Sequence, residues 1–373
     1  MASVRDVLII GGGVIGLTSA YFLAKRGLRV TVVEAGEFGQ ESSWAGAGII
    51  SPGHPRRARS PLGRLRALSA SMFAELSAEL REQTGLDNGY WPCGGLELRR
   101  SHDALERARI ETILREEQGE GATCELLEGE QLRHKEPALA ETLPGAIYFP
   151  EMAQIRNPWH IRALIAACNQ LHVELRAYSP VSDLVTDKHC ITAAWTPQER
   201  LIADKYVICA GAWADRLLQN LGLSLGIRPM RGQIALLRTS KLILHHIIMG
   251  GEEYLVPRRD GHILIGSTVE DVGFDKRTTA RAIAHLLETA IQWVPALREA
   301  ELVRAWAGLR PGSPDSRPFI GRVPGYDNLY IAAGHFRSGI TLSPGTALLV
   351  SELILGLVPS VPLEPFRIER LAT

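Results

Sequence analysis

The N-terminal part of the chain alternates short apolar runs with one helical stretch. Val7 to Ile10 is a run of apolar, mostly β-branched residues, which is typical of a strand buried on both faces. A helix is expected from about Val14 to Arg26, because Gly27 follows as a natural stop signal. A second apolar run, Val30 to Val33, completes a strand–helix–strand pattern, and such a unit places its two strands in parallel.

The remaining chain carries further helical and strand-like segments. Apolar residues recur at helical spacing, and we expect helices over residues 62–80, 102–118, 157–171 and 279–293, and a final helix that begins between residues 341 and 344. Asn157 and Pro158 are expected to cap the third of these helices. Short alternating or apolar runs predict strands over residues 94–99, 144–148, 173–178, 181–185, 189–195, 205–210, 233–238, 253–256, 262–268 and 329–333.

The order of these segments predicts two interleaved domains. A length of 373 residues is long for one hydrophobic core, and between residues 227 and 306 the pattern changes to antiparallel strands. We therefore expect an α/β protein in which a Rossmann-like dinucleotide-binding domain is interleaved with an α+β domain built on a mostly antiparallel sheet. The expected boundaries give residues 1–90, 150–225 and 307–373 to the first domain, and residues 91–149 and 226–306 to the second.

Three glycines between the first strand and the first helix carry the strongest chemical signal. Gly11, Gly13 and Gly16 have the spacing G-x-G-x-x-G, which suits a tight turn, the close approach of a pyrophosphate, and the packing of helix on strand. Glu34 ends the second strand, where a carboxylate accepts hydrogen bonds from an adenosine ribose. A dinucleotide site is expected here. A purely structural turn is the alternative, and the motif alone does not separate FAD from NAD.

Composition narrows the classes of partner and the compartment. The chain has 41 basic and 41 acidic residues, so its net charge gives no case for nucleic acid or an anionic membrane. No apolar run reaches the roughly 20 residues that span a bilayer, and the first strand begins so early that no signal peptide is expected. The five cysteines are scattered and the eleven histidines lack a ligand spacing. This predicts a cytoplasmic protein with reduced thiols and no metal site.

Three loops are candidates for contact with a ligand or partner. Mostly small residues fill Ser42 to Gly48, directly after the ribose-binding carboxylate, and we favour contact with a flat ligand over a merely flexible loop. His54 to Arg66 carries five arginines; a solvated loop and helix start is favoured over a patch for an acidic partner. Gly334 to Gly339 forms a glycine-bracketed turn before the final helix, whose N-terminus can face an anionic ligand.

Over its whole length the chain resembles the FAD-dependent amine and D-amino acid oxidase family, and within it most of all the glycine oxidases of thiamine biosynthesis. The stretches that carry the resemblance are GGGVIG, SSWAGAGI, EEYLVP, WAGLRP and AGHFRSGI. The resemblance implies an FAD-binding fold that a substrate domain interrupts twice. It also implies FAD contacts at Gly11, Gly13, Val14, Ile15, Gly16, Glu34, Ala35, Ser42, Ser43, Ala47, Gly48, Ile49, Val181, His335, Phe336, Arg337, Ser338, Gly339, Ile340 and Thr341.

The same resemblance assigns three residues to the substrate and its oxidation. Arg310 corresponds to the family's carboxylate-binding arginine, Tyr254 to the tyrosine that closes over the carboxylate, and Arg337 to a second substrate-contacting arginine. An arginine fork pairs with a carboxylate through two hydrogen bonds. The alternatives are an interdomain salt bridge for Arg310, sheet packing for Tyr254, and a structural or flavin-side role for Arg337.

The reaction that the resemblance implies is FAD-dependent oxidative deamination. Glycine, sarcosine, D-alanine or D-proline would transfer a hydride from the α-carbon to flavin N5, giving a 2-oxo acid, ammonia and, with dioxygen, hydrogen peroxide. A role in forming the thiazole of thiamine and a homotetramer are implied as well. The alternatives are a quinone-dependent D-amino acid dehydrogenase, a sarcosine-oxidase-like demethylase, a noncatalytic flavoprotein or tRNA-modifying partner domain, and an NAD-dependent dehydrogenase.

Two departures from relatives modify this expectation. No cysteine follows Cys209, so the covalent flavin link of sarcosine-oxidising relatives is not expected and FAD should be bound noncovalently. Val269 stands where some glycine oxidases place a methionine against the substrate. This predicts a changed pocket volume and leaves the ranking of substrates open.

Overall fold

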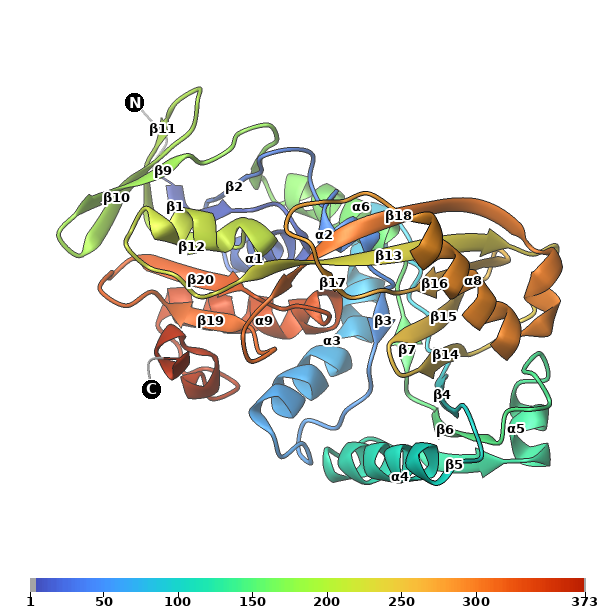
Figure 1. The fold of residues 1–373 in the computed structure, drawn as a ribbon. Helices are drawn as coiled ribbons and strands as arrows, with labels where there is room; N and C mark the ends of the chain where they lie inside the picture. The colour runs from blue at the N-terminus through green and yellow to red at the C-terminus, as the bar shows by residue number, and fades with distance from the viewer. Residues whose placement is uncertain (1–4, 372–373) are drawn as a thin grey trace.

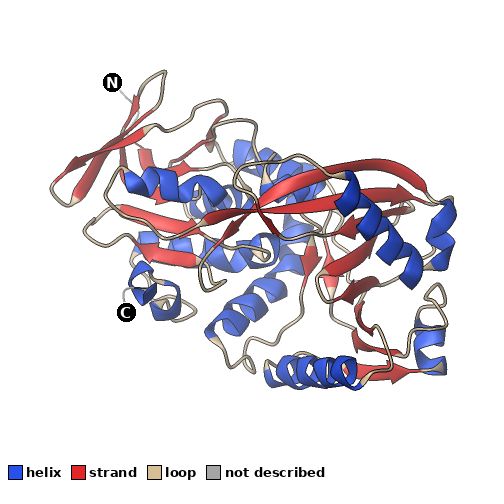
Figure 2. Ribbon diagram, in the orientation of Figure 1, coloured by secondary structure: helices blue, strands red, loops and turns tan. Residues whose placement is uncertain are grey.

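Two large sheets and the helices packed on them make up the structure, a computed structural model that describes residues 5–371. A parallel sheet lies on the side of both termini and a larger, mostly antiparallel sheet on the other side (Figures 1 and 2). The long strands β13 (Arg228–Arg238) and β18 (Glu301–Gly312) extend between these two sides. The α/β class expected from the sequence is confirmed. None of the helices within residues 5–371 combines the length and the apolar character that a membrane span requires.

The smaller sheet has six strands in the order β19-β20-β12-β1-β2-β8. Their bounds are β1 (Arg5–Ile10), β2 (Val30–Val33), β8 (Glu174–Arg176), β12 (Ala203–Ile208), β19 (Phe319–Arg322) and β20 (Leu329–Ala333). All neighbours are parallel except β19 and β20. Val7 lies opposite Val30 on one side and Lys205 on the other, so β1 is an interior strand. Its apolar run is buried on both faces, as expected for a parallel sheet.

Helices cover one face of the six-stranded sheet, and a strand meander with a short helix covers the other. The helices are α1 (Val14–Lys25), α3 (Pro61–Thr84), α6 (Asn157–Gln170) and α9 (Gly339–Leu355). The opposite face packs against β9 (Asp183–Asp187), β10 (Cys190–Trp195), β11 (Arg200–Leu201) and α7 (Ala214–Gln219). Packing from both sides fixes the carboxyl ends of β1 and β2, where the glycine turn begins.

The larger sheet has nine strands. Eight lie in the order β17-β13-β16-β15-β14-β4-β6-β5, and β18 pairs along the other edge of β13. The bounds not yet given are β4 (Gly95–Arg99), β5 (Glu125–Glu128), β6 (Gly145–Phe149), β14 (Ile247–Gly250), β15 (Glu253–Pro257), β16 (His262–Gly266) and β17 (Glu270–Asp271). All neighbours are antiparallel except β4 and β14.

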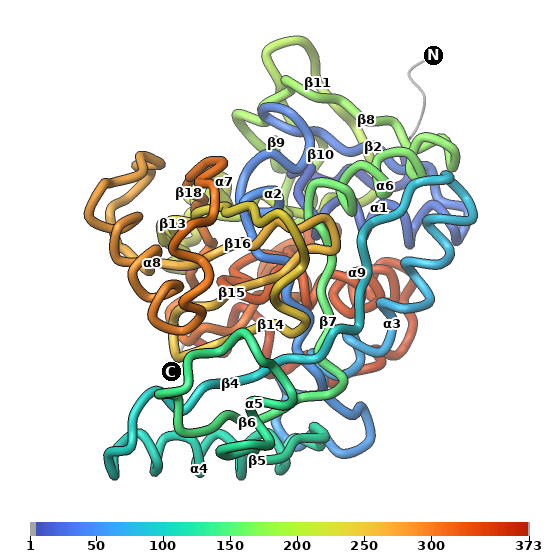
Figure 3. The backbone as a smooth tube through the Cα atoms, turned by 90° about the vertical axis from the view of Figure 1, so that its right-hand side faces the viewer, coloured from blue at the N-terminus to red at the C-terminus, as the bar shows by residue number. Residues whose placement is uncertain are grey.

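The two faces of the larger sheet have different coverings, because alternate side chains point to opposite faces. One face packs against α8 (Ala280–Trp293). The other carries Ile147, Ile234 and Val256, which pack with Ile110 of α4 (Ala104–Gly119) and with Ala47 of the small-residue loop, residues 42–49. In Figure 3 the strands descend from β13 to β6, with α8 to the left and α4 at the bottom. The face that carries Ile234 is therefore the one turned toward the glycine-turn half of the molecule.

Short elements complete the chain, and a few expectations need correction. The short elements are α2 (Ser42–Ala45), β3 (Ile49–Ile50) paired with β7 (Ala153–Gln154), and α5 (Glu130–Lys135). Sequence patterns missed β5, β14, β18 and β19, and the two-residue strands β3, β7, β11 and β17. The expected helix cap at Asn157 is wrong, since α6 begins at Asn157 with Arg156 as its N-cap. Asn157 Nδ2 instead donates a hydrogen bond to the Ser43 carbonyl oxygen at 2.8 Å.

Candidate active site

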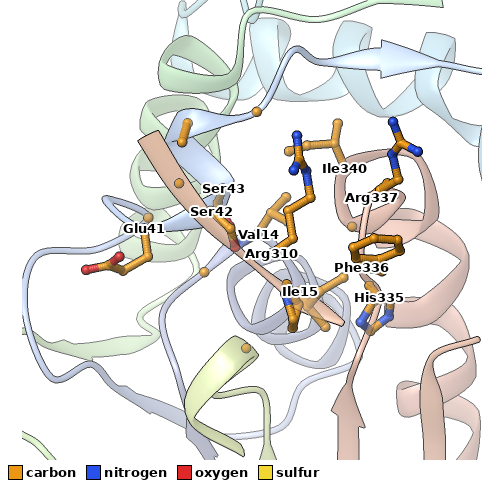
Figure 4. Close-up of a pocket in the computed structure, with 18 of the residues that line it drawn as sticks. Val14, Ile15, Glu41, Ser42, Ser43, Arg310, His335, Phe336, Arg337 and Ile340 are labelled. Atoms are coloured by element: carbon orange, nitrogen blue, oxygen red, sulfur yellow. The ribbon is translucent and has the colours of Figure 1, made fainter. Parts of the chain in front are cut away.

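One cavity of about 630 Å³ runs between the two sheets and brings nearly all the predicted site residues together. It begins at the carboxyl ends of β1 and β2 and reaches β13, β15 and β18. The predicted residues that line it are Gly11, Gly13, Val14, Ile15, Glu34, Ala35, Ser42, Ser43, Ala47, Gly48, Ile49, Val181, Tyr254, Arg310, His335, Phe336, Arg337, Ser338, Gly339, Ile340 and Thr341. Gly16 does not line it. Figure 4 shows ten of the lining residues with labels.

Backbone geometry explains the glycines of the turn. Gly11 has a φ of +114°, and a Cβ there would lie 2.4 Å from a backbone oxygen of the chain after β12. A Cβ on Gly16 would lie 1.9 Å from the Gly11 carbonyl oxygen, so this glycine lets α1 pack against the turn. Gly13 is the N-cap of α1 and makes no side-chain cap bond. The positive end of α1 is therefore directed at the cavity, an arrangement that suits a pyrophosphate.

Glu34 occupies the same end of the cavity. Its carboxylate accepts hydrogen bonds from the amides of Gly12 at 2.7 Å and Gly36 at 3.0 Å, which hold it beside the glycine turn. Each carboxylate oxygen keeps a further acceptor position. Those positions can receive the hydroxyls of an adenosine ribose.

Side chains from distant segments hold the small-residue loop, residues 42–49, against the cavity. Asn157 Nδ2, Trp306 Nε1 and Arg258 Nη2 donate to the carbonyl oxygens of residues 43, 45 and 47, at 2.8, 3.1 and 2.8 Å. The Ser43 hydroxyl in turn accepts a hydrogen bond from the Val14 amide at 2.9 Å. The loop is therefore positioned rather than free, as contact with a ligand requires.

Arg258 is a buried cation that sequence patterns did not single out. It is 7% exposed, and besides the Ala47 oxygen it donates to Gln154 Oε1 at 2.6 Å and to the Ile155 carbonyl oxygen at 2.9 Å. Burial lowers the pKa of Arg258 to about 10, and the charge of Arg156 adds to this effect. In the sequence, Arg258 is linked to the site only by its position directly after the EEYLVP stretch.

The turn before α9 forms another wall of the cavity. His335 is buried, and its Nε2 lies 3.1 Å from Thr346 Oγ1. Burial lowers the pKa of His335 to about 3, so the ring is neutral at physiological pH. Thr341 Oγ1 donates to the Ile49 carbonyl oxygen at 2.8 Å and so joins α9 to the small-residue loop. The N-terminal turn of α9 lines the cavity, where its partial positive charge favours a ligand with negative charge.

Arg310 stands on β18 at the far end of the cavity from Glu34. Its Nη1 donates to the Thr268 carbonyl oxygen at 2.9 Å and its Nη2 to Ser267 Oγ. Both acceptors are neutral, and no carboxylate within residues 5–371 forms an ion pair with this guanidinium. Burial lowers the pKa of Arg310, Tyr254 opposes that shift, and Arg337 adds to it. The side chain is an uncompensated cation facing a cavity, which is what a substrate carboxylate needs.

Two glycines of the sheet make room for Arg310 and Tyr254. A Cβ on Gly232 would lie 2.2 Å from Arg310 Nη1, and a Cβ on Gly266 would lie 2.4 Å from Tyr254 Cζ. Gly266 is directly opposite Tyr254 in the pairing of β15 with β16. Neither glycine was recognised from the sequence, because its importance depends on which strand pairs with it.

Three further observations at this end correct or extend the sequence-based expectations. Met249 of β14 lines the cavity, whereas Val269 does not and is 38% exposed. The expected effect of Val269 on pocket volume is therefore wrong, because the side chain is directed to solvent. Arg337 Nη2 lies 2.8 Å from Glu252 Oε2, so this second arginine already has a partner. In Figure 4 the guanidinium groups of Arg310 and Arg337 both lie at the top of the view, beyond Val14 and Ile15.

Comparison with known proteins decides the family. The sequence matches the family described as FAD dependent oxidoreductase (DAO) over residues 6–353. The chain belongs to this family. It is similar to the glycine oxidase of Pseudomonas putida, with 37% identity over 97% of this chain and 98% of that protein. The solved glycine oxidase from Geobacillus kaustophilus has 35% identity and a TM-score of 0.92 over 98% of both chains. The bifunctional protein ThiO/ThiG of Nostoc sp. is 35% identical over 94% of this chain and 53% of its own length.

Membership in the DAO family, together with the similarity to glycine oxidases over nearly the whole chain, shows an FAD-dependent amino acid oxidase, and the cavity fits that cofactor. A Cβ on Gly11 or Gly12 would lie within 2.4 Å of neighbouring atoms, the N-cap residue Gly13 contributes no side-chain cap at the start of α1, and Glu34 accepts from the Gly12 amide beside it. Glu34 would hold the adenosine ribose and the start of α1 the pyrophosphate, and the small-residue loop lines the same cavity as Arg310. The contacts of individual residues with FAD and substrate stay predictions.

Proposed function

We propose that this chain oxidises glycine and other small amines, namely sarcosine, D-alanine and D-proline, with noncovalently bound FAD and dioxygen. In the balanced reaction glycine, water and dioxygen give glyoxylate, ammonia and hydrogen peroxide. The observation that carries the proposal is the uncompensated guanidinium of Arg310 in the cavity that begins at the glycine turn. The glycine oxidases among the relatives support it.

Arg310 and Tyr254 bind and orient the substrate in this proposal. The guanidinium binds the carboxylate. The Tyr254 side chain, which lines the same cavity, adds a neutral hydrogen-bond donor and a flat aromatic wall. Fixing the acid group leaves the α-carbon of a small amino acid in one orientation relative to the cofactor. This use of binding to impose geometry supplies a large part of the rate enhancement in such reactions.

Bound FAD supplies hydride acceptance at N5 and reaction with dioxygen. The protein groups around it need not transfer a proton in the redox step. His335 is neutral, Glu252 is paired with Arg337, and Glu253 lies 3.2 Å from His285 Nε2. The substrate amine must be uncharged to release a hydride, so we expect turnover to rise with pH through the ionisation of that amine.

The metabolic role, the oligomeric state and the cellular location are each proposed from a single observation. Similarity to bifunctional ThiO/ThiG proteins supports supply of a product for the thiazole of thiamine. A homotetramer is carried over from the family resemblance. We place the enzyme in the cytoplasm because all five cysteines lie within the described residues and are free thiols.

A substrate panel tests the proposal. The purified holoprotein should release FAD on denaturation, and it should form hydrogen peroxide in air with glycine, sarcosine, D-alanine or D-proline. Flavin reduction by these amines without peroxide would instead support a dehydrogenase that uses a quinone. Absence of flavin reduction by the whole panel would refute the proposed function.

A further inference from the structure

The substrate end of the cavity holds two arginines with different partners. Arg310 donates only to neutral oxygens in the described part of the chain. Arg337, from the turn before α9, forms an ion pair with Glu252, from the turn between β14 and β15. Its Nη2 also lies 3.5 Å from the Glu252 carbonyl oxygen. Both arginines and Glu252 line the cavity.

Of the two guanidiniums at this end, only Arg310 lacks a carboxylate partner within residues 5–371. The positive charge of Arg337 is offset by Glu252, whereas the next carboxylate, Glu253 at the start of β15, lies beside His285 and forms no ion pair with either arginine. One unpaired guanidinium matches one substrate carboxylate. A second acid group on the substrate would meet a guanidinium that is already engaged and a carboxylate of its own sign.

We propose that Glu252 is a specificity-determining residue, which by neutralising Arg337 restricts the enzyme to amines with a single carboxylate. This inference rests on the proposed function, since it concerns the substrate end of that same cavity. The side chains of Arg337 and Glu252 are 36% and 59% exposed, so solvent screens the pair. The expected effects are accordingly moderate.

Two ethers that cannot be oxidised as amines provide a binding test. Methoxyacetate has the shape of sarcosine with one carboxylate, and oxydiacetate has the shape of iminodiacetate with two. The dissociation constant of each is measured from the change in flavin absorbance of the holoprotein. Wild type should bind methoxyacetate more tightly than oxydiacetate. Glu252→Gln should shift the ratio of the two constants toward oxydiacetate by about fivefold, and Glu252→Ala should do the same if the amide variant folds poorly.

Matched variants separate the ion pair from a general loss of negative charge. Glu253→Gln removes the adjacent carboxylate, at the start of β15, and should leave the ratio within about twofold of wild type, because that carboxylate does not pair with Arg337. In the double variant Glu252→Gln/Arg337→Gln, the shift of the ratio toward oxydiacetate should disappear. An unchanged ratio in both Glu252 variants, an equal shift in Glu253→Gln, or a gain that survives in the double variant would each overturn the proposal.

Turnover provides a second readout. Oxidation of iminodiacetate breaks one α-C–H bond, and the resulting imine is hydrolysed, so that iminodiacetate, water and dioxygen give glyoxylate, glycine and hydrogen peroxide. Glu252→Gln should raise kcat/KM for iminodiacetate relative to sarcosine. If wild type oxidises none of the small amines, the proposed function fails, while the ether titrations still test the role of Glu252. If wild type oxidises sarcosine and the ratio does not respond to Glu252, only the specificity proposal fails.

Discussion

The guanidinium of Arg310 lies against Gly232 so closely that a Cβ on the glycine would be 2.2 Å from Nη1. Gly232 and Arg310 are diagonal neighbours on β13 and β18, because Met230 is directly opposite Arg310 and Gly232 is opposite Gly308. Diagonal residues on one face of a sheet are within reach of a long side chain. The orientation of Arg310 thus depends on the absence of a side chain two residues along the partner strand.

Gly232→Ala should therefore impair glycine oxidation without loss of the cofactor. The added methyl group displaces the guanidinium, and a misplacement of about 1 Å lowers kcat/KM by about tenfold to a hundredfold. Steady-state kinetics and the flavin absorbance of the purified variant measure the two effects. Gly119→Ala is the matched control, since a Cβ there meets nothing within 4 Å; an equal loss in both variants would refute the role of Gly232.

Arg258→Met should destabilise the protein and weaken FAD binding together. The substitution leaves the Ala47 and Ile155 carbonyl oxygens and Gln154 Oε1 without their buried donor, a loss of about 2–3 kcal/mol. Urea unfolding measures the free energy, and titration of the apoprotein with FAD measures the affinity. Arg259→Ala, at the exposed neighbouring residue, should cost less than about 1 kcal/mol through its contact with the Trp91 ring. Normal FAD affinity in Arg258→Met would show that the small-residue loop does not need this tether.

Acid should destabilise the fold through two buried neutral histidines. Burial lowers the pKa of His335 to about 3 and that of His160 to about 4, whereas an unfolded histidine has a pKa of about 6.5. Below about pH 6.5 the unfolded chain binds more protons at these residues than the folded chain does. The free energy of unfolding should therefore fall as pH drops from about 6.5 to 4, by at most about 2.7 kcal/mol per pH unit.

Urea unfolding between pH 8 and pH 5 checks this dependence. His160 does not line the cavity, so His160→Gln isolates the stability effect from the site. The two histidines together contribute a pH-dependent slope to the free energy of unfolding, and His160→Gln should remove about half of that contribution. A variant whose slope equals that of wild type would contradict the assignment of buried neutral histidines.

The parts of the fold that follow from local patterns could be predicted from the sequence. The glycine turn, α1 and β2 were readable because their signals lie within one short stretch, and the family resemblance located Tyr254 and Arg310. The strands β14 and β19 were missed because each has only four residues and, unlike the equally short β2, lies outside any strand–helix–strand pattern. The domain boundaries proposed from the sequence stay a prediction.

Relations between distant segments could not be predicted. The bond from Asn157 to Ser43 and the pairing of Arg337 with Glu252 join residues 114 and 85 positions apart, and no local pattern specifies such partners. Val269 shows the same limit, since correspondence with a family position did not reveal that its side chain faces solvent. These contacts depend on how β13, β15 and β18 pair, which becomes visible only in three dimensions.

The carboxylate site at Arg310 is tested most directly by the KM for glycine of Arg310→Ala. Removing the charged partner of a desolvated carboxylate should cost about 2–5 kcal/mol in binding, so KM should rise on the order of 30-fold or more while FAD stays bound. Arg304→Ala, on the same strand but with its guanidinium over the Trp44 ring, serves as control and should keep a KM near that of wild type. A KM for Arg310→Ala equal to that of wild type, with FAD retained, would contradict the account.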